Sequence, residues 1–210
     1  MAKAIILRLE SYLTYLSQLQ EEGKTSTTSQ ELAKLFGISS SRVRQDLVAL
    51  GTIGKPRSGY DIAGLKQMIT SALDVDTIKQ ICLIGCGNLG RALAGSDLWK
   101  SGGFELRAIF DKDPKIIGTE IGNLKVRNIT ELFGAIKSEN IQSACLTVPP
   151  AAAQQVADLL IAAGVEGIWN FSPIEIYAPV NVVVENQRLE QGLMTLSFRM
   201  KRIGNSYGGQ

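Results

Sequence analysis

The sequence predicts an α/β protein with two parts, a helix-turn-helix domain at the N-terminus and a parallel-sheet domain after it. Through residues 4–50, apolar side chains recur at helical spacing. From Ile78 onward, short apolar runs alternate with helical patterns, which is typical of βαβ units. A glycine-rich turn joins the first of these runs to a helix. The chain has 210 residues, 45% of them hydrophobic, which is enough for one full domain and a smaller companion.

The N-terminal part carries the start and stop signals of three helices. Residues 4–22 form the first apolar stripe. Thr28 and Glu31 form a capping box for a second helix, which stops at Gly37. Ser39 caps a third helix, whose inward residues are Val43, Leu47 and Leu50. A helix, a short glycine-containing turn and a second helix together predict a helix-turn-helix motif.

The third helix has the character of a DNA-recognition helix. The whole chain has a net charge of only +2, yet the stretch from Arg42 to Arg57 holds four basic residues against Asp46, a local charge of +3. Local basic clustering suits docking into a DNA groove, although the charge cluster taken by itself favours an ordinary solvated face. Arg44 and Gln45 are the candidates for contacts to base edges, because Arg pairs with guanine and Gln with adenine. Residues 51–60 suit a β-wing. The candidate DNA-binding residues are Ser40, Ser41, Arg42, Arg44, Gln45, Lys55, Arg57 and Tyr60.

The C-terminal part begins after a connecting helix near 63–73 and a polar linker at 74–77. Strands are expected at 81–84, 106–110, 144–148, 167–171 and 182–184, and helices at 88–101, 130–138 and 151–163. Residues 187–202 form an amphipathic helix with Leu189, Leu193, Leu196 and Met200 on one stripe.

The turn after the first strand matches a dinucleotide-binding fingerprint, Gly85-x-Gly87-x-x-Gly90. The first glycine allows the tight turn, the second lets the backbone approach a pyrophosphate, and the third lets helix pack on strand. Asp111 follows the next strand at the spacing of about 20 residues expected for an acceptor of the ribose hydroxyls. Its carboxylate favours NAD over NADP, whereas Lys112 beside it leaves NADP open. A turn-capping role for Asp111 is the alternative.

Segments at the ends of later strands should border the same site, because ligands of open parallel sheets lie across the carboxyl ends of the strands. Asn170 can offer its amide to the ligand or stabilise its own turn, and the sequence favours neither. Leu189 is a candidate for contact with a partner's nicotinamide, or a dimer-core leucine. The candidate cofactor-binding residues are Gly85, Cys86, Gly87, Asn88, Leu89, Gly90, Asp111, Lys112, Val148, Pro149, Asn170, Phe171 and Leu189.

Composition excludes several other classes of protein. The chain has no His and only three Cys, so we expect no metal site and no disulfide framework. Cys86 lies next to the expected phosphates, and a thiol redox sensor is a minor alternative there. The sequence lacks a signal peptide and any apolar run of about 20 residues. We therefore expect a cytoplasmic protein.

Taken in order, these segments resemble the Rex family of redox-sensing transcriptional repressors over nearly the entire chain. The resemblance is carried by Arg8-Leu9, Glu31-Leu32-Ala33, Val43-Arg44-x-Asp46-Leu47, Gly59-Tyr60, Gly85-x-Gly87-Asn88-Leu89-Gly90-Arg91-Ala92-Leu93, Phe110-Asp111-x-Asp113-Pro114, Val148-Pro149 and Asn170-Phe171-x-Pro173. It implies a homodimer with a winged-helix domain (1–76), a Rossmann domain (77–186) and a C-terminal helix exchanged between subunits (187–210). It also implies binding of palindromic operator DNA in the NAD⁺ or free form and release by NADH.

The chain departs from that family in two regions. Gln45 stands where the family usually has Lys, and the wing reads Lys55-Pro56-Arg57-Ser58-Gly59-Tyr60, which suggests a shifted or relaxed operator preference. The resemblance also implies a switch formed by the first-helix Arg8, a Tyr and an Asp, and here the last two positions hold Ser96 and Arg188. Two like charges do not attract each other, so the family's discrimination between NADH and NAD⁺ is not implied for this chain. Asp97 and Glu190 are the alternative partners of Arg188 that would restore a switch.

Two rival functions therefore stay open beside a NADH-responsive repressor. One is a small NAD-dependent oxidoreductase with a basic module. We expect no catalytic residues, because the sequence offers no paired acid and base and almost no residues for a substrate domain. The other is a DNA-binding dimer that holds NAD(H) without redox discrimination.

Overall fold

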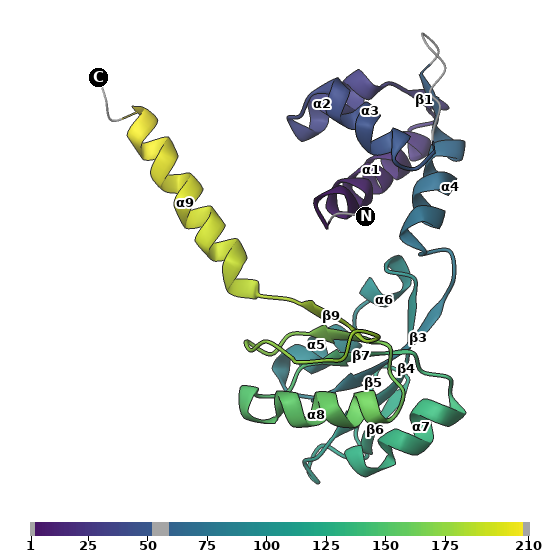
Figure 1. Ribbon diagram of the computed structural model, residues 1–210, viewed down its shortest axis with the longest axis vertical. Coiled ribbons are helices and arrows are strands. Elements are labelled where there is room, and N and C mark those ends of the chain that lie inside the picture. Colours follow the sequence, from purple (N-terminus) through teal and green to yellow (C-terminus); the bar gives the residue numbers. More distant parts are fainter. Residues whose placement is uncertain (1–2, 52–58, 208–210) are drawn as a thin grey trace. The chain divides into compact units, whose positions relative to one another are not determined.

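The computed structural model describes residues 3–51 and 59–207, with backbone only for 202–207. The chain divides into two compact units, Met1–Thr77 and Ile78–Gln210. Figure 1 labels their helices and strands. Among the described helices, none combines the length and apolar character that a bilayer span needs.

The N-terminal unit is helical with one small antiparallel ribbon. Its elements are α1 (Lys3–Glu21), β1 (Ser26–Thr27), α2 (Ser29–Phe36), α3 (Ser40–Val48), β2 (Tyr60–Asp61) and α4 (Ile62–Leu73). The expected caps are present: the Thr28 hydroxyl accepts from the Glu31 N–H, the Glu31 carboxylate accepts from the Thr28 N–H, and Ser39 caps α3. Gly37 ends α2 in the left-handed conformation that favours glycine, with φ of 61°.

The core of this unit lies where α1 and α4 pack on α2 and α3. Its fully buried side chains include Leu9, Tyr12, Leu16, Leu32, Val43, Leu47 and Ile69. The predicted inward face of α3 is confirmed at Val43 and Leu47, whereas Leu50 is only partly buried. The predicted wing falls mainly on residues 52–58, which lie outside the described residues.

The C-terminal unit is a seven-stranded, mostly parallel sheet. Its elements are β3 (Lys79–Ile84), α5 (Asn88–Ala94), α6 (Leu98–Ser101), β4 (Phe104–Asp111), β5 (Glu120–Ile121), β6 (Leu124–Asn128), η1 (Ile129–Glu131), α7 (Leu132–Ser138), β7 (Ser143–Leu146), α8 (Pro150–Ala162), β8 (Gly167–Asn170), β9 (Val183–Asn186) and α9 (Leu189–Tyr207). The strand order is β5-β6-β4-β3-β7-β8-β9, and only β5 pairs antiparallel within this sheet. The order reverses between β3 and β7, where ligands of such sheets bind.

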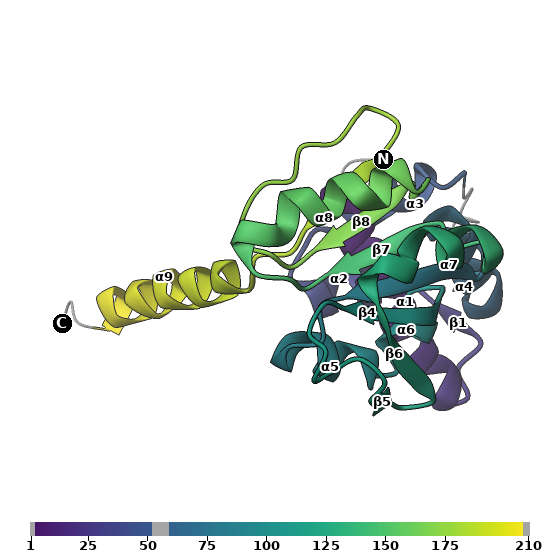
Figure 2. The same cartoon turned by 90° about the horizontal axis from the view of Figure 1, so that it is seen from below.

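Alternating side chains of β3 serve two separate cores. Cys82 and Ile84 pack with α7 and α8 on one face, whereas Ile81 and Leu83 pack with α5 and α6 on the other. Figure 2 shows α7 and α8 on one side of the strands and α5 on the opposite side. Both faces of the central strands are thus buried, which explains their continuous apolar runs.

Two parts of the sequence-based prediction were wrong in detail. The single helix expected at 88–101 is divided into α5 and α6 by Gly95-Ser96-Asp97, and the Trp99 indole N–H donates to the Leu93 carbonyl at 2.9 Å across the break. The β5–β6 hairpin was missed. Leu124-Lys125-Val126-Arg127 alternates apolar and charged side chains, the pattern of a half-exposed strand, and this signal was available in the sequence.

Candidate nucleotide cavity and nucleic-acid interface

Each fingerprint glycine has a separate geometric reason. Gly85 has φ of 99°, and a Cβ there would lie 2.9 Å from the Thr147 carbonyl oxygen. A Cβ on Gly90 would lie 1.9 Å from the Gly85 carbonyl oxygen, so the helix packs too closely on the turn for any side chain. By contrast, a Cβ on Gly87 would meet no atom within 4 Å. The space at Gly87 therefore opens into the cavity described below.

Thr147 at the end of β7 fixes this turn from the neighbouring strand. Its hydroxyl lies 2.7 Å from the Gly85 carbonyl oxygen and 3.0 Å from that of Ile84. One hydroxyl hydrogen shared by two carbonyls holds the turn against β7. Sequence reasoning did not predict this role for Thr147.

Asp111 closes the turn from the β4 side. Its Oδ2 accepts the Cys86 N–H at 2.6 Å, and its Oδ1 accepts the Asp113 N–H at 2.9 Å. The carboxylate therefore both caps its own turn, as the alternative interpretation expected, and stands at the mouth of the cavity. Each oxygen retains a second acceptor position for a ribose hydroxyl.

A cavity of about 660 Å³ lies over the carboxyl ends of β3, β4 and β7. Its size lies within the usual range for cofactor sites. Of the candidate cofactor residues, it is lined by Gly85, Gly87, Asn88, Leu89, Asp111, Lys112, Val148 and Pro149. The structure adds an apolar wall that the sequence did not predict, formed by Ile116, Ile129, Ala152, Val156 and Leu159, with Gln155 beside it.

Four of the other candidates do not line the cavity. The Asn170 side chain is fully buried and donates to the Ile174 carbonyl and to Asn186 Oδ1, both at 2.8 Å, so it stabilises its own loop. The Phe171 ring packs on Trp169, with 4.4 Å between ring centroids, instead of lining the cavity. Leu189 lies on α9 with 60% of its side chain exposed. Gly90 acts through packing, as described above.

The thiol-sensor interpretation of Cys86 is not supported. The side chain is fully buried, and burial together with the nearby Asp111 charge raises the pKa of the Cys86 thiol to about 11. Thiolate is the reactive form of cysteine, and very little of it forms at neutral pH. Burial also raises the pKa of Cys82 and Cys145, which lie in the cores on the two faces of the sheet.

On α3, the candidate DNA-binding residues share one exposed face. Ser41, Arg42, Arg44 and Gln45 are exposed and Ser40 is half-buried. Tyr60 is half-buried in β2 and packs against the N-terminal core, so only part of its ring is accessible. Lys55 and Arg57 lie outside the described residues.

Sequence reasoning counted Asp46 only as a negative charge on α3 and did not predict its burial. Its side chain is only 2% exposed, and Arg8 on α1 binds both of its oxygens, at 2.6 and 2.7 Å. The Tyr12 hydroxyl donates to the same carboxylate at 3.0 Å. Arg8 of α1 therefore neutralises the charge of Asp46, the one acidic residue that was subtracted in the local charge of +3. On the exposed face of α3, Arg42 lies 3.8 Å from the same carboxylate, whereas Arg44 contacts the Ser29 hydroxyl.

The two arginines assigned to the switch each have a carboxylate partner. Arg8 pairs with Asp46, and Arg188 pairs with Glu175 instead of Asp97 or Glu190. The Ser96 hydroxyl donates to the Leu93 carbonyl at 2.8 Å. The assignment of these three residues to a switch stays a prediction.

Comparison with known proteins gives matches both to the part of the chain with the nucleotide cavity and to the part with the helix-turn-helix motif. A family model described as "CoA binding domain" matches residues 76–174, and one described as "Putative DNA-binding protein N-terminus" matches residues 1–47. The chain is 35% identical over 203 residues to the redox-sensing transcriptional repressor Rex of Clostridium acetobutylicum, covering 97% of this chain and 95% of the relative.

Solved structures give the same result. The Rex-family repressor RSP in complex with NADH matches with a TM-score of 0.90 and 32% identity, covering 100% of this chain and 98% of that one. Its complex with NAD⁺ and operator DNA matches with a TM-score of 0.90, 33% identity and the same coverage. The chain belongs to the Rex family of redox-sensing transcriptional repressors.

Proposed function

We propose that this chain is a transcriptional repressor that binds operator DNA as a homodimer and releases it when NADH, rather than NAD⁺, occupies the cavity. The observation that carries the proposal is the relative that was solved with both NAD⁺ and operator DNA and that matches the chain over its full length. Such a regulator works in the cytoplasm, where DNA and NAD(H) are both accessible.

The nucleotide cavity suits a dinucleotide through its own residues. The backbone at Gly87 leaves room for the pyrophosphate, and Asp111 is positioned to accept the ribose hydroxyls. The same carboxylate would repel a 2′-phosphate, which favours NAD(H) over NADP(H). Bound NADH and NAD⁺ differ in the charge and shape of the nicotinamide ring. A ligand shifts a conformational equilibrium only through different affinities for its two states, so the response depends on contacts near this ring.

On the DNA side, α3 would enter the major groove of a palindromic site. Arg44 is exposed, and its guanidinium lies 3.4 Å from the Ser29 hydroxyl at the start of α2. This contact holds the side chain over the face formed by both helices of the motif.

We expect Arg44→Ala to weaken operator binding by about 1–3 kcal/mol and to relax the preference at one base pair. A gel shift against the operator and its single-base variants would measure both effects. Lys100→Ala removes the same charge from the C-terminal unit and serves as the control. Equal losses for the two variants would contradict a base-edge role for Arg44.

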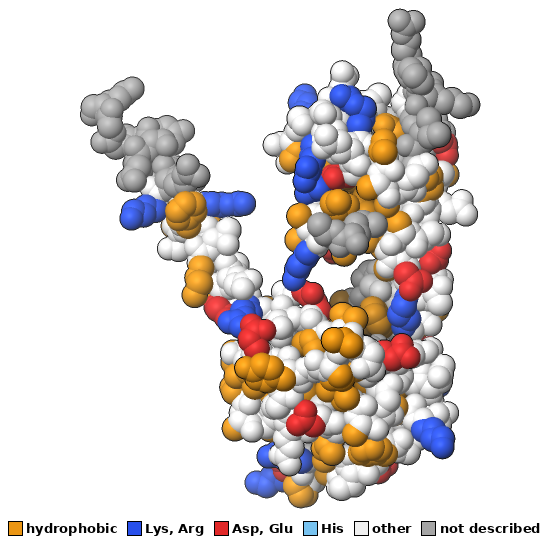
Figure 3. All heavy atoms as spheres, in the orientation of Figure 1, with side chains coloured by type: hydrophobic (Ala, Val, Ile, Leu, Met, Phe, Trp, Pro, Cys, Tyr) orange, Lys and Arg blue, Asp and Glu red, His pale blue; other side chains and the backbone are white. Residues whose placement is uncertain are grey.

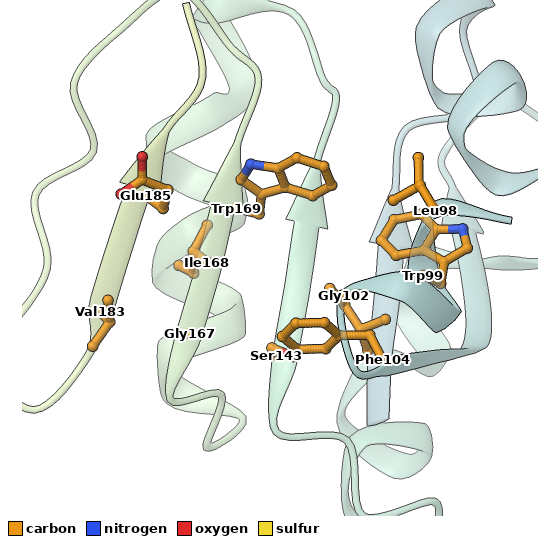
Figure 4. A pocket seen from close by; sticks show the side chains of 11 residues that line it. Leu98, Trp99, Gly102, Phe104, Ser143, Gly167, Ile168, Trp169, Val183 and Glu185 are labelled. Atoms are coloured by element: carbon orange, nitrogen blue, oxygen red, sulfur yellow. The ribbon is translucent and has the colours of Figure 1, made fainter. Parts of the chain in front are cut away.

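The homodimer is supported by two apolar surfaces that nothing in the described chain covers. On α9, Leu189, Leu193, Leu196 and Met200 form one stripe and are each at least 55% exposed; Figure 3 shows apolar side chains along this helix. On the α5–α6 side of the sheet, Trp99 and Trp169 are among the residues that line a groove of about 370 Å³. Figure 4 shows Leu98 and Trp99 on one side of it and Ile168, Trp169 and Glu185 on the other. A second copy of the chain would cover both surfaces.

We expect the double change Leu193→Glu and Leu196→Glu to convert the dimer into a folded monomer, because burying an unpaired charge costs several kcal/mol. Sedimentation velocity would measure the molar mass of the particle. Thr195→Glu lies on the same helix outside the stripe and should leave the dimer intact. A dimer that survives the double change would exclude the stripe from the interface.

Separate titrations of NADH and NAD⁺ into the protein–operator complex test the function itself. Release of DNA by NADH but not by NAD⁺ supports the repressor. If neither nucleotide changes the binding of operator DNA, the result supports a DNA-binding dimer that holds NAD(H) passively. Turnover of a co-substrate would instead favour an oxidoreductase.

A further inference from the structure

Arg188 stands immediately before α9 and is tied to the loop that connects β8 and β9. Its guanidinium forms an ion pair with Glu175 in that loop. The Arg188 carbonyl accepts the Gln191 N–H at 3.2 Å within the first turn of α9. The start of the helix is therefore fixed to the loop through one residue.

The pair continues into the core as a chain of polar contacts. The second oxygen of Glu175 accepts from the Asn186 amide at 3.1 Å. The Asn186 oxygen accepts from the Asn170 amide at 2.8 Å, and Asn170 is fully buried at the end of β8. An unbroken series of side chains thus joins the carboxyl end of the sheet to the start of α9.

The same loop is held by the helix that forms a wall of the nucleotide cavity. Gln154 of α8 donates to the Tyr177 carbonyl at 3.0 Å and accepts the Tyr177 N–H at 2.9 Å. Its neighbours on α8, Ala152 and Gln155, line the cavity. A displacement of α8 caused by a ligand would therefore reach the loop directly.

We propose that Arg188, Glu175 and Asn186 form a latch that sets the position of α9 according to the state of the nucleotide cavity. This inference rests on the proposed function and adds a route by which the signal reaches the helix. Arg188 is a positioning residue in this scheme, because it acts through α9 and not on the ligand.

The residues of the latch are exposed enough that changing them should alter the latch without altering the folding of the chain. The side chains of Arg188 and Glu175 are 35% and 63% exposed. Ion pairs of such exposure contribute little to global stability, so variants of the pair should fold normally. Their effect should be confined to the order of the α9 start and to the response to NADH.

The test compares Arg188→Gln and Glu175→Gln with the unchanged chain. Arg107→Gln, which opens the exposed Arg107–Glu105 pair on β4, is the matched control. In the latch variants, amide hydrogen exchange should be faster in the first two turns of α9. The NADH concentration for half-release of operator DNA should change by about fivefold or more, the lower end of typical coupling between sites. Arg107→Gln should change neither quantity.

Charge reversal provides the rescue. The double variant Glu175→Arg with Arg188→Glu should restore the slower hydrogen exchange at the start of α9, because the ion pair forms again. It should not restore the response to NADH, because a guanidinium cannot accept the hydrogen bond from the Asn186 amide. If NADH releases DNA from the unchanged chain and from both single variants at the same concentration, the latch is overturned while the proposed function stands. If NADH fails to release DNA from the unchanged chain, the proposed function fails, and unaltered hydrogen exchange in the variants would then remove the latch as well.

Discussion

Asp46→Asn is expected to abolish operator binding and to destabilise the N-terminal unit by about 3 kcal/mol, the order of magnitude for breaking one side of a buried ion pair. The carboxylate receives three hydrogen bonds, two from Arg8 and one from Tyr12, and it lies on α3. These bonds hold the recognition helix on α1. An amide in place of the carboxylate leaves the Arg8 guanidinium without its counter-charge.

Urea unfolding and a gel shift measure the two effects, with Glu10→Gln on the exposed side of α1 as the control. A triple change, Arg8→Met, Tyr12→Phe and Asp46→Leu, should recover much of the lost stability. Apolar groups of similar volume often replace a buried ion pair without loss, and Tyr12→Phe removes the hydroxyl that would otherwise lose its acceptor. Full operator affinity in Asp46→Asn would show that the pair does not position α3.

The same carboxylate should give the unit an acid-sensitive contribution to stability. Burial opposes ionisation of Asp46, but the hydrogen bonds from Arg8 and Tyr12 outweigh it and lower the pKa of Asp46 below its ordinary value. The contribution is therefore fully present above the ordinary carboxyl pKa of about 3.9. It is lost as the pH falls through the lower folded pKa. Asp46→Asn should remove this part of the pH dependence, which unfolding curves at pH 7 and pH 3 would measure.

The second large effect concerns two glycines of the fingerprint, Gly87 and Gly90, whose substitution by alanine should have different consequences for stability. Gly90→Ala should lower the melting temperature of the C-terminal unit and abolish nucleotide binding, because its Cβ would stand 1.9 Å from a backbone oxygen. Overpacking of this kind typically costs about 1–3 kcal/mol, and backbone yields less readily than a side chain. Gly87→Ala should leave the melting temperature unchanged, since its φ of −67° suits alanine and its Cβ meets no atom.

Gly87→Ala should nevertheless weaken NADH binding by about tenfold or more, a difference of roughly 1.4 kcal/mol, because the methyl group would occupy the space of the pyrophosphate. Calorimetric titration with NADH and a thermal melt without it distinguish the two variants. Gly134→Ala in α7, where a Cβ also meets no atom, is the control. Normal NADH affinity in Gly87→Ala would place the pyrophosphate elsewhere.

The features that the sequence predicted best are those with local causes. The Thr28–Glu31 capping box and the glycine turn depend on neighbours a few residues apart, and both are present as expected. The core strands were predicted because both of their faces are buried.

The features that the sequence missed depend on contacts between distant segments. The burial of Asp46 requires α1 and α3 to cross at Arg8, 38 residues away, and nothing near Asp46 in the sequence signals it. The contact that ties Asn170 to its loop depends on Asn186, which approaches only because β9 pairs with β8. The apolar wall on α8 was missed because its side chains belong to a helix whose other residues pack in the core.

The perpendicular indoles of Trp99 and Trp169, 6.1 Å apart between ring centroids, give this protein a built-in optical probe. The chain has only two tryptophans, and both border the same open groove. Near-ultraviolet emission therefore arises almost entirely from one place on the molecule. Trp99 is already buried in the single chain, whereas Trp169 is half-buried. Assembly of two subunits over that place would remove the Trp169 indole from water and move its emission to shorter wavelength, so association could be followed without attaching any dye.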